Sequence, residues 1–177
     1  EWFRGEEDYF VARTMRSAAR FLENCRDRAP FFLYIDTFDP HEVFDPPKQY
    51  AELYCRNYPF QRSIYGYGAK HSAVRREDAE WIRGLYAGKV SLVDTWFGYL
   101  MDSIERLGLM DDTVIAFTSD HGTEFFEHGR IQKGATQIYR TVTRIPLLIH
   151  APGAASRPGK QIDALVSAVD IAPTLLR

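Results

Sequence analysis

Two stretches of the chain carry an apolar residue at every third or fourth position, the pattern of a helix with one buried face. The first covers residues 7–28 and is closed by Pro30, and the second covers about 77–108 and ends at Gly108. We therefore predict a helix over each stretch. The second contains three glycines, which indicate close packing against a neighbour: Gly84, Gly88 and Gly98.

Short continuous apolar runs predict strands that are buried on both faces. They occupy residues 31–35, 114–118 and 146–150, with a shorter run at 164–166. Asp170 then precedes a predicted helix that starts at Ile171. Prolines interrupt the pattern between the first strand and the long helix, where we expect one short helix near Gln49–Cys55.

Helices that alternate with apolar strands indicate an α/β fold with a central, largely parallel sheet and helices on both faces. The chain has 177 residues, of which 45% are hydrophobic, enough for one sizeable core. We expect residues 1–177 to be part of a single domain. The sequence contains no internal repeat and no low-complexity segment.

The charge balance narrows the range of partners. The formal net charge is −2, which gives no electrostatic basis for binding nucleic acid or an anionic membrane. No apolar run approaches the length of a membrane span, and residues 1–8 do not resemble a signal peptide. Because the chain starts without Met, we expect it to be an internal piece of a longer protein, and both a cytoplasmic and a periplasmic location stay open.

The most polar strand exits are candidate sites, because ligands in α/β sheets bind beyond the carboxyl ends of strands. One exit runs from Asp36 to His41, and the other is Ser119-Asp120-His121-Gly122. Asp120 and His121 are candidate ligands of a divalent metal, since carboxylate oxygen and imidazole nitrogen both bind such ions. An isolated Asp-His pair is more often a turn aspartate beside a surface histidine, and two ligands alone are too few for a firm metal site.

Three further residues could take part in chemistry. His41 follows a proline in a loop and could act as a general acid, because histidine titrates near physiological pH. Lys133, between glycines, could bind an oxyanion as a point charge. His128, in Glu127-His128-Gly129, is a third candidate for the site. Each of these residues could also be an ordinary solvated side chain.

Residues 113–129 resemble the segment of sulfatases that carries the last metal ligands, an Asp-His-Gly followed by Glu-His-Gly. The family has a lysine about thirteen positions after the aspartate, and Lys133 is thirteen positions after Asp120. Further agreement follows in Arg144-Ile145-Pro146 and Pro152-Gly153. Upstream, Pro30-Phe31-Phe32-Leu33 and Asp39-Pro40-His41 are similar to the strand and Pro-His loop of the same family.

This resemblance, to the sulfatase branch of the alkaline phosphatase superfamily, implies a set of roles. Asp120 and His121 would bind the metal, and Lys133 would bind the sulfate and stabilise the leaving oxygen. His41 would bind the sulfate or protonate the leaving group, and His128 would contact the substrate. The implied activity is hydrolysis of a sulfate ester of a small molecule or sugar by an enzyme of the sulfuric ester hydrolase class.

The nucleophile of that family is a formylglycine made from Cys or Ser in Cys/Ser-x-Pro-x-Arg. Neither Cys25 nor Cys55 fits this motif or any metal-binding spacing, and two further aspartate ligands are also missing. We expect the nucleophile and both aspartates to lie upstream of residue 1, and the isolated piece to be inactive. Phe126 stands where the family frequently has a small residue.

Two alternatives stay open. A phosphonate monoester or phosphodiester hydrolase of the same superfamily would share the Asp-His-Gly and the lysine. The second alternative is a non-catalytic metal-binding module, in which His41 and Lys133 would have no shared role. For the metal, the resemblance implies calcium, whereas a histidine ligand favours manganese or zinc; we expect calcium, with the other two as alternatives.

Overall fold

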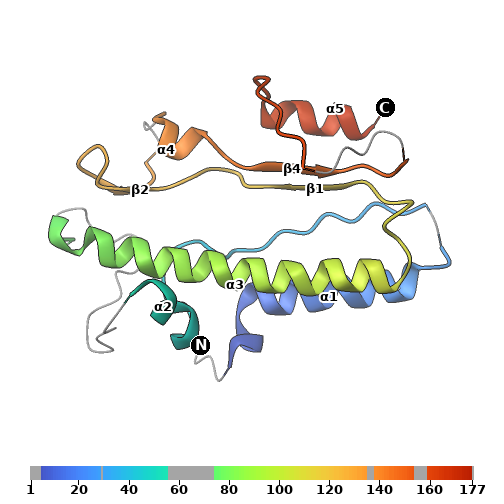
Figure 1. Ribbon diagram of the computed structural model, residues 1–177, viewed down its shortest axis with the longest axis horizontal. Helices are drawn as coiled ribbons and strands as arrows, with labels where there is room; N and C mark the ends of the chain where they lie inside the picture. The colour runs from blue at the N-terminus through green and yellow to red at the C-terminus, as the bar shows by residue number, and fades with distance from the viewer. Residues whose placement is uncertain (1–4, 29, 56–73, 135–137, 154–158, 177) are drawn as a thin grey trace. The chain divides into compact units, whose positions relative to one another are not determined.

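The computed structural model describes residues 5–28, 30–55, 74–134, 138–153 and 159–176 (Figure 1). The chain divides into two compact units. Unit 1 comprises Glu1–Leu109 and Glu124–Gln132, and unit 2 comprises Met110–Thr123 and Lys133–Arg177. Both helices and strands are present, as the α/β class predicts. The assignment of residues 1–177 to one catalytic domain stays a prediction.

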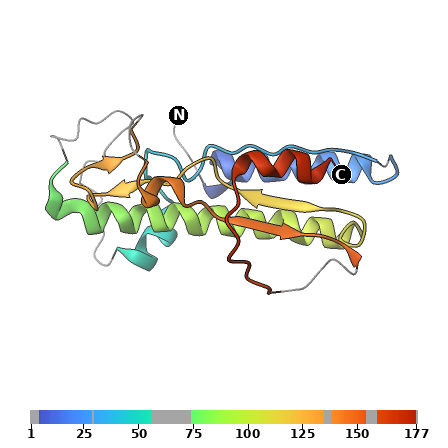
Figure 2. The same ribbon diagram turned by 90° about the horizontal axis from the view of Figure 1, so that it is seen from above.

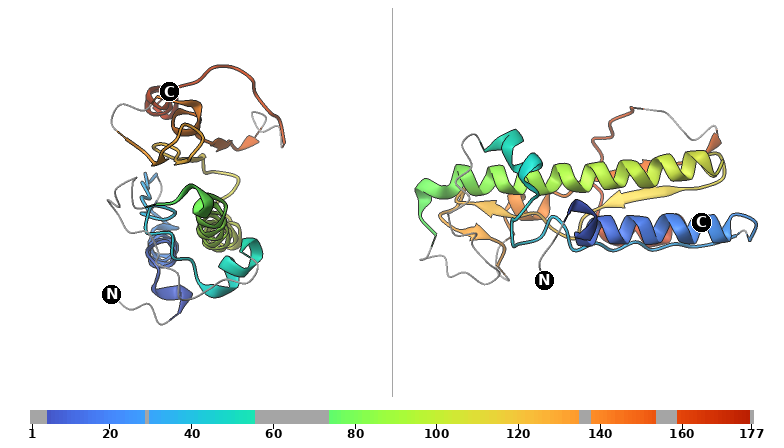
Figure 3. Two further views of the ribbon diagram at one scale, coloured as in Figure 1. Left: turned by 90° about the vertical axis from the view of Figure 1, so that its left-hand side faces the viewer. Right: turned by 90° about the horizontal axis from the view of Figure 1, so that it is seen from below.

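Two long helices lie side by side in unit 1 (Figures 1 and 3). They are α1 (Phe10–Cys25), after a 3-10 turn η1 (Glu6–Asp8), and α3 (Ala79–Arg106), after a 3-10 turn η3 (Arg76–Asp78). Both helices were predicted. Most of the apolar face predicted for α1 is buried, which accounts for its packing: Val11, Met15, Ala18, Ala19 and Leu22. Phe10 and Phe21, also predicted for this face, are 47% and 38% exposed.

The helix α2 (Lys48–Tyr54) confirms the short predicted helix and packs against α3. Two of the three glycines of α3 make this contact possible. A Cβ atom at Gly88 would lie 3.0 Å from the carbonyl oxygen of Tyr50, and one at Gly84 would lie 2.5 Å from Sγ of Cys55. The prediction of close packing is wrong for Gly98, where a Cβ atom would meet nothing within 4 Å.

A second layer of packing in unit 1 involves a small hairpin. Strand β2 (Glu124–Phe125) pairs antiparallel with β3 (Ile131–Gln132). Phe125 and Ile131 join a buried cluster with residues of α2, α3 and the preceding loop: Phe44, Ala51, Cys55, Val74, Ile82 and Leu85. Two-residue strands are too short to produce a recognisable alternation in the sequence, so the hairpin was not predicted.

Residues 31–35 are not a strand buried on both faces, and this prediction is wrong. The segment has no assigned strand among the described residues, and its side chains from 31 to 38 alternate between half-buried and exposed. Phe32 and Tyr34 are 79% and 76% exposed. Only one face of this extended segment is therefore covered, by α1.

In unit 2, strand β1 (Ile115–Thr118) pairs with β4 (Leu147–His150), as seen in Figure 2. Both strands were predicted, but their pairing is antiparallel, with Thr118 opposite Leu147. Both strand pairs among the described residues are antiparallel, and the predicted α/β class is confirmed. The prediction of full burial is wrong, since Leu148 and Ile149 are 61% and 55% exposed.

The remaining elements of unit 2 are short. They are α4 (Arg140–Thr143), a 3-10 turn η5 (Ala168–Asp170) and α5 (Ile171–Leu175), the last as predicted. No strand is assigned at residues 164–166, and Leu165 is fully exposed, so that prediction is wrong. Among the described helices of the chain, none is both long enough and apolar enough to cross a membrane.

Candidate active site

Asp120 and His121 lie directly beyond the end of β1, as predicted for metal ligands. The end of the strand is fixed by Thr118, whose hydroxyl donates to the carbonyl oxygen of Pro146 at 2.9 Å. Ser119 continues the turn by donating from Oγ to the carbonyl oxygen of His121 at 2.9 Å. The Asp120 side chain is 82% exposed and that of His121 is 33% exposed, so both can reach a ligand.

The two side chains face each other. Nε2 of His121 lies 3.3 Å from Oδ2 of Asp120, while the backbone N–H of His121 donates to Oδ1 at 2.9 Å. Nδ1 of His121 lies 2.8 Å from the carbonyl oxygen of Gly122. A carbonyl can only accept, so we assign the proton to Nδ1, which leaves the lone pair of Nε2 directed to the carboxylate side.

Gly122 allows this turn because it approaches the neighbouring backbone closely. Its N–H donates to the carbonyl oxygen of Val142 at 2.7 Å. A Cβ atom at this position would overlap the carbonyl oxygen of Thr141 and lie 3.2 Å from its carbonyl carbon. The glycine is required here by lack of space for a side chain.

The Asp120–His121 pair fits part of a metal site. Two ligands of one divalent ion, each about 2.0–2.6 Å from it, are about 3 Å apart, close to the observed 3.3 Å. No group of three or more His, Cys, Asp or Glu side chains arranged for a metal occurs in the described part of the chain. The two residues therefore supply one oxygen and one nitrogen donor, and a complete shell needs further ligands.

His41 lies in unit 1, in a loop whose interactions fix the ring. Its Nδ1 is 2.8 Å from the carbonyl oxygen and 2.9 Å from Oε2 of Glu42, a buried residue. The ring stacks on Phe38 with centroids 4.3 Å apart, and the backbone N–H of His41 donates to the carbonyl oxygen of Phe38. Nδ1 is thus engaged by Glu42, which fixes the orientation of the ring.

His128 also lies in unit 1, on the β2–β3 turn, and is paired with an acid that the sequence analysis did not single out. Its Nδ1 hydrogen-bonds Oε1 of Glu124, whose side chain is fully buried, whereas the His128 side chain is 37% exposed. The nearby Glu127 carboxylate accepts from the N–H of Phe125 and pairs with Arg83 at 2.9 Å. Although burial opposes it, these backbone hydrogen bonds and Arg83 lower the pKa of Glu127.

Lys133 follows β3 directly and is partly buried. The residue before it, Gln132, has φ of 68°, and Phe126 at the start of the turn has φ of 69°. Both are left-handed conformations that cost a side-chain-bearing residue about 1–3 kcal/mol and occur often at functional sites. Glycine would adopt the φ value of Phe126 without this cost.

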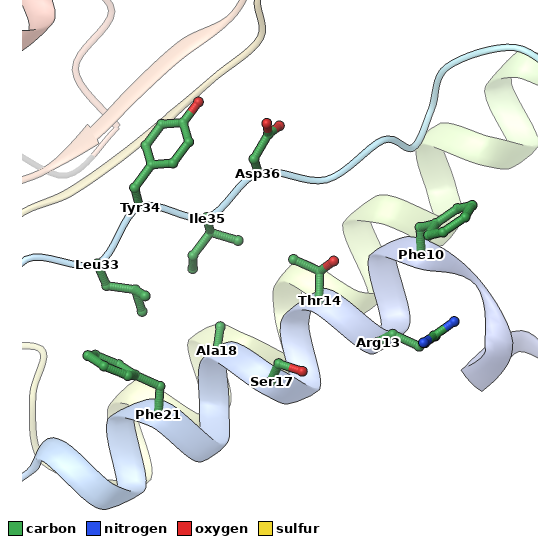
Figure 4. A pocket seen from close by; sticks show the side chains of 10 residues that line it. All are labelled: Phe10, Arg13, Thr14, Ser17, Ala18, Phe21, Leu33, Tyr34, Ile35 and Asp36. Carbon is green, nitrogen blue, oxygen red and sulfur yellow. The ribbon is translucent and has the colours of Figure 1, made fainter.

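A pocket of about 490 Å³ lies between α1 and the extended segment 33–36 (Figure 4). Apolar side chains of Ala18, Phe21, Leu33 and Ile35 line much of it. None of the five predicted site residues is among its lining residues. Asp36, the first residue of the polar segment that runs to His41, is among the lining residues.

The structure thus brings Asp120 and His121 together within unit 2, and gives His41 and His128 each a carboxylate partner within unit 1. Sequence analysis missed Glu124 and also Lys89, a buried cation on α3. A signal for Lys89 was present, because it lies four residues after Leu85 and three before Leu92 on the apolar face of the helix. The assignment of the five predicted residues to a site stays a prediction.

Comparisons with known proteins place this arrangement in a family. The sequence model of the Sulfatase family matches residues 1–177. Arylsulfatase of Clostridium perfringens is 28% identical, over 88% of this chain and 35% of its own length. Iduronate 2-sulfatase of Mus musculus is 30% identical, over 80% of this chain and 30% of its own length.

A solved structure of the same superfamily is also similar to this chain. The phosphonate monoester hydrolase of Agrobacterium radiobacter is 27% identical with a TM-score of 0.83, and the match covers 97% of this chain and 38% of that enzyme. The chain thus spans about a third of the length of these proteins. With the family match extending over every residue and the Asp-His-Gly turn at the end of β1, the chain belongs to the sulfatase family, within the alkaline phosphatase superfamily.

Proposed function

We propose that the protein containing this chain is a metal-dependent hydrolase of sulfate esters. The observation that carries the proposal is the Asp120–His121 pair, held at the end of β1 in a chain that matches the sulfatase family throughout. Iduronate 2-sulfatase is named for a sulfated sugar, which supports a sugar or other small-molecule sulfate as the substrate class.

Each candidate residue then has a distinct role. The Lys133 ammonium would bind a sulfate oxygen and stabilise the charge on the leaving oxygen. Nε2 of His41 would hold the proton that is delivered to the leaving oxygen, since Nδ1 is engaged by Glu42. His128, oriented by Glu124, would contact the ester from the β2–β3 turn.

Asp120 and His121 would hold a divalent metal through Oδ2 and Nε2. When bound, that ion supplies Lewis-acid neutralisation of the ester oxygens. Calcium is the proposed metal, and manganese or zinc is the alternative favoured by the nitrogen donor. Dialysis of the full-length protein against a chelator removes the metal, and each metal is then titrated back. We expect the wild type to bind the added metal and Asp120→Asn not to bind it.

The nucleophile proposed is a formylglycine that lies outside residues 1–177. Cys55 does not suit this role. Its side chain is buried, its Sγ donates to the carbonyl oxygen of Trp81 at 3.5 Å, and burial raises the pKa of its thiol. Neither cysteine is followed by the Pro-x-Arg that marks the modified residue in this family.

A second candidate is hydrolysis of phosphonate monoesters or phosphate diesters. It is supported by the likeness to the phosphonate monoester hydrolase of Agrobacterium radiobacter. Sulfate and phosphonate groups are both tetrahedral oxyanions, so a lysine and a metal suit either one.

The full-length protein should be assayed with an aryl sulfate, a sugar sulfate, a phosphonate monoester and a phosphate diester under the same conditions. The highest kcat/KM should be for a sulfate ester, and Lys133→Ala should lower it by roughly 100-fold or more. Lys160→Ala, at an exposed lysine of unit 2, is the matched control and should leave kcat/KM unchanged. A preference for the phosphonate would select the second candidate, and turnover of none of the four would refute both.

A further inference from the structure

The loop that carries His41 is fastened to the long helix α3 by one buried cation. Nζ of Lys89 lies 2.5 Å from Oδ1 of Asp39 and 3.1 Å from Oδ1 of Asp45. The Lys89 and Asp39 side chains are only 6% and 2% exposed. Two ionic contacts thus reach the loop on both sides of His41, two residues before it and four residues after it.

The same two acids tie the loop to the start of α1. Oδ2 of Asp39 accepts the backbone N–H of Val11 at 2.8 Å, in the first turn of the helix, where a carboxylate is favourable. The backbone carbonyl of Asp45 accepts the hydroxyl of Tyr9 at 2.7 Å. Nζ of Lys89 also lies 5.5 Å from the centroid of the Tyr9 ring, so one cation is shared by α1, α3 and the loop.

The segment between Asp39 and Asp45 is also held by contacts of its own. The backbone N–H of His41 bonds the Phe38 carbonyl, and the His41 ring is fixed by stacking on Phe38 and by Glu42. A displacement of Asp39 would therefore move the imidazole, because the contacts of the ring with Phe38 and Glu42 lie within the same loop. Reaction rates fall steeply when a reacting group is misplaced by about 1 Å.

We propose that Lys89 is a positioning residue for His41, and that it sets where the His41 imidazole stands through Asp39 and Asp45. The inference rests on the proposed function, in which His41 protonates the leaving oxygen. Lys89 itself is buried under the loop and is not expected to touch the substrate.

The test is a mutant cycle in the full-length protein. Lys89→Met removes the cation and leaves Asp39 as a buried unpaired charge, which can prevent folding. The second variant, Lys89→Met with Asp39→Asn, removes both charges and keeps an acceptor for the Val11 N–H. Both changes are also made in a His41→Ala background. Lys48→Met is the matched control, because its ion pair with Glu52 is exposed on α2.

We expect kcat to fall roughly 10- to 100-fold in the Lys89 variants, with KM changed by less than about threefold. In the His41→Ala background the same changes should alter kcat by less than about twofold, because the group being positioned is already absent. An equal loss with and without His41 would overturn the proposal, and so would wild-type kcat in the variant that carries both Lys89→Met and Asp39→Asn. Failure of both variants to fold would also overturn it, by making Lys89 a purely structural requirement.

A readout that does not use turnover separates this inference from the proposed function. The NMR signal of the His41 ring in histidine-labelled protein is assigned by its loss in His41→Ala. It should shift or broaden in the variant with Lys89→Met and Asp39→Asn, and not in Lys48→Met. An unmoved signal refutes the positioning role whether or not the enzyme cleaves sulfate esters. A moved signal in a protein without sulfatase activity refutes only the proposed function.

Discussion

The fully buried carboxylate of Glu124 hydrogen-bonds Nδ1 of His128, whose ring is partly exposed on the β2–β3 turn. Glu124 is the first residue of β2, and the next residue, Phe125, belongs to the core of unit 1. A core strand therefore sets the direction of an exposed imidazole. Because the carboxylate of Glu124 is the acceptor, we assign a proton to Nδ1 of His128.

Replacing this acid should affect both stability and substrate binding. Glu124→Ala removes the acceptor for Nδ1 and opens a cavity, and should lower the free energy of unfolding by about 1–3 kcal/mol. Glu124→Gln keeps an acceptor and should cost less. Urea unfolding of the full-length protein measures both, and Glu52→Gln, at an exposed acid, serves as the control. If His128 contacts the ester, KM should rise in Glu124→Ala; an unchanged KM would argue against that role.

Replacing Gly122 or Gly98 by alanine should change the stability of the protein in opposite directions. Gly122→Ala would place Cβ against the backbone of Thr141, displacing the turn that presents Asp120 and His121. We expect a loss of about 1–3 kcal/mol in stability and a weakening of metal affinity by about tenfold or more. Metal affinity is measured by calorimetric titration of chelator-treated protein. Retention of full affinity in this variant would remove the Asp120–His121 turn from the proposed metal site.

Gly98→Ala, in α3, meets nothing within 4 Å and should raise the stability by about 0.5–1 kcal/mol, because alanine is the better helix former. Its metal affinity should equal that of the wild type. Destabilisation by this change would show that Gly98 packs closely after all in the full-length protein.

The pH dependence of stability should carry a contribution from Glu127. The pKa of this carboxyl is lowered in the folded protein from its ordinary value of 4.5; burial opposes the shift, while backbone hydrogen bonds and Arg83 produce it. The ionised carboxylate therefore stabilises the fold above about pH 4.5, and this contribution is lost as the pH falls through the folded-state pKa. Glu127→Gln should flatten the stability profile of the full-length protein below pH 4.5.

Arg83→Met should flatten the same profile in part, since it removes only one of the groups that lower the pKa. Arg106→Met is the control, because its pair with Glu23 is longer, at 3.5 Å, and exposed. An identical acid slope in wild type and Glu127→Gln would contradict the assigned shift.

The two cysteines should differ in their reaction with a thiol reagent. Burial raises the pKa of Cys55, so little thiolate forms at neutral pH, whereas Cys25 lies partly exposed at the end of α1. Cys25 should be alkylated much faster, and peptide mass mapping after short exposure to iodoacetamide distinguishes the two. Faster labelling of Cys55 would mean that the α2–α3 contact opens readily in solution.

The sequence by itself determined α1, α2, α3 and α5 and the two strands of unit 2, because the pattern of apolar residues depends only on the chain. It also determined the Asp-His-Gly turn and the lysine after it, and through them the family. The helices α1 and α3 illustrate this: their apolar stretches match the observed elements to within a few residues at each end.

Only the tertiary structure decided which partner each element takes. The antiparallel pairing of β1 with β4 and the one-sided covering of residues 31–35 depend on contacts that apolar runs do not encode. The same holds for the polar contacts of the candidate site. Asp39 and Lys89 are fifty positions apart in the sequence, and Glu124 carries no local sign that its carboxylate turns inward to His128. Such pairs form because burying a charged side chain is costly unless the fold places an opposite charge or a hydrogen-bond partner beside it.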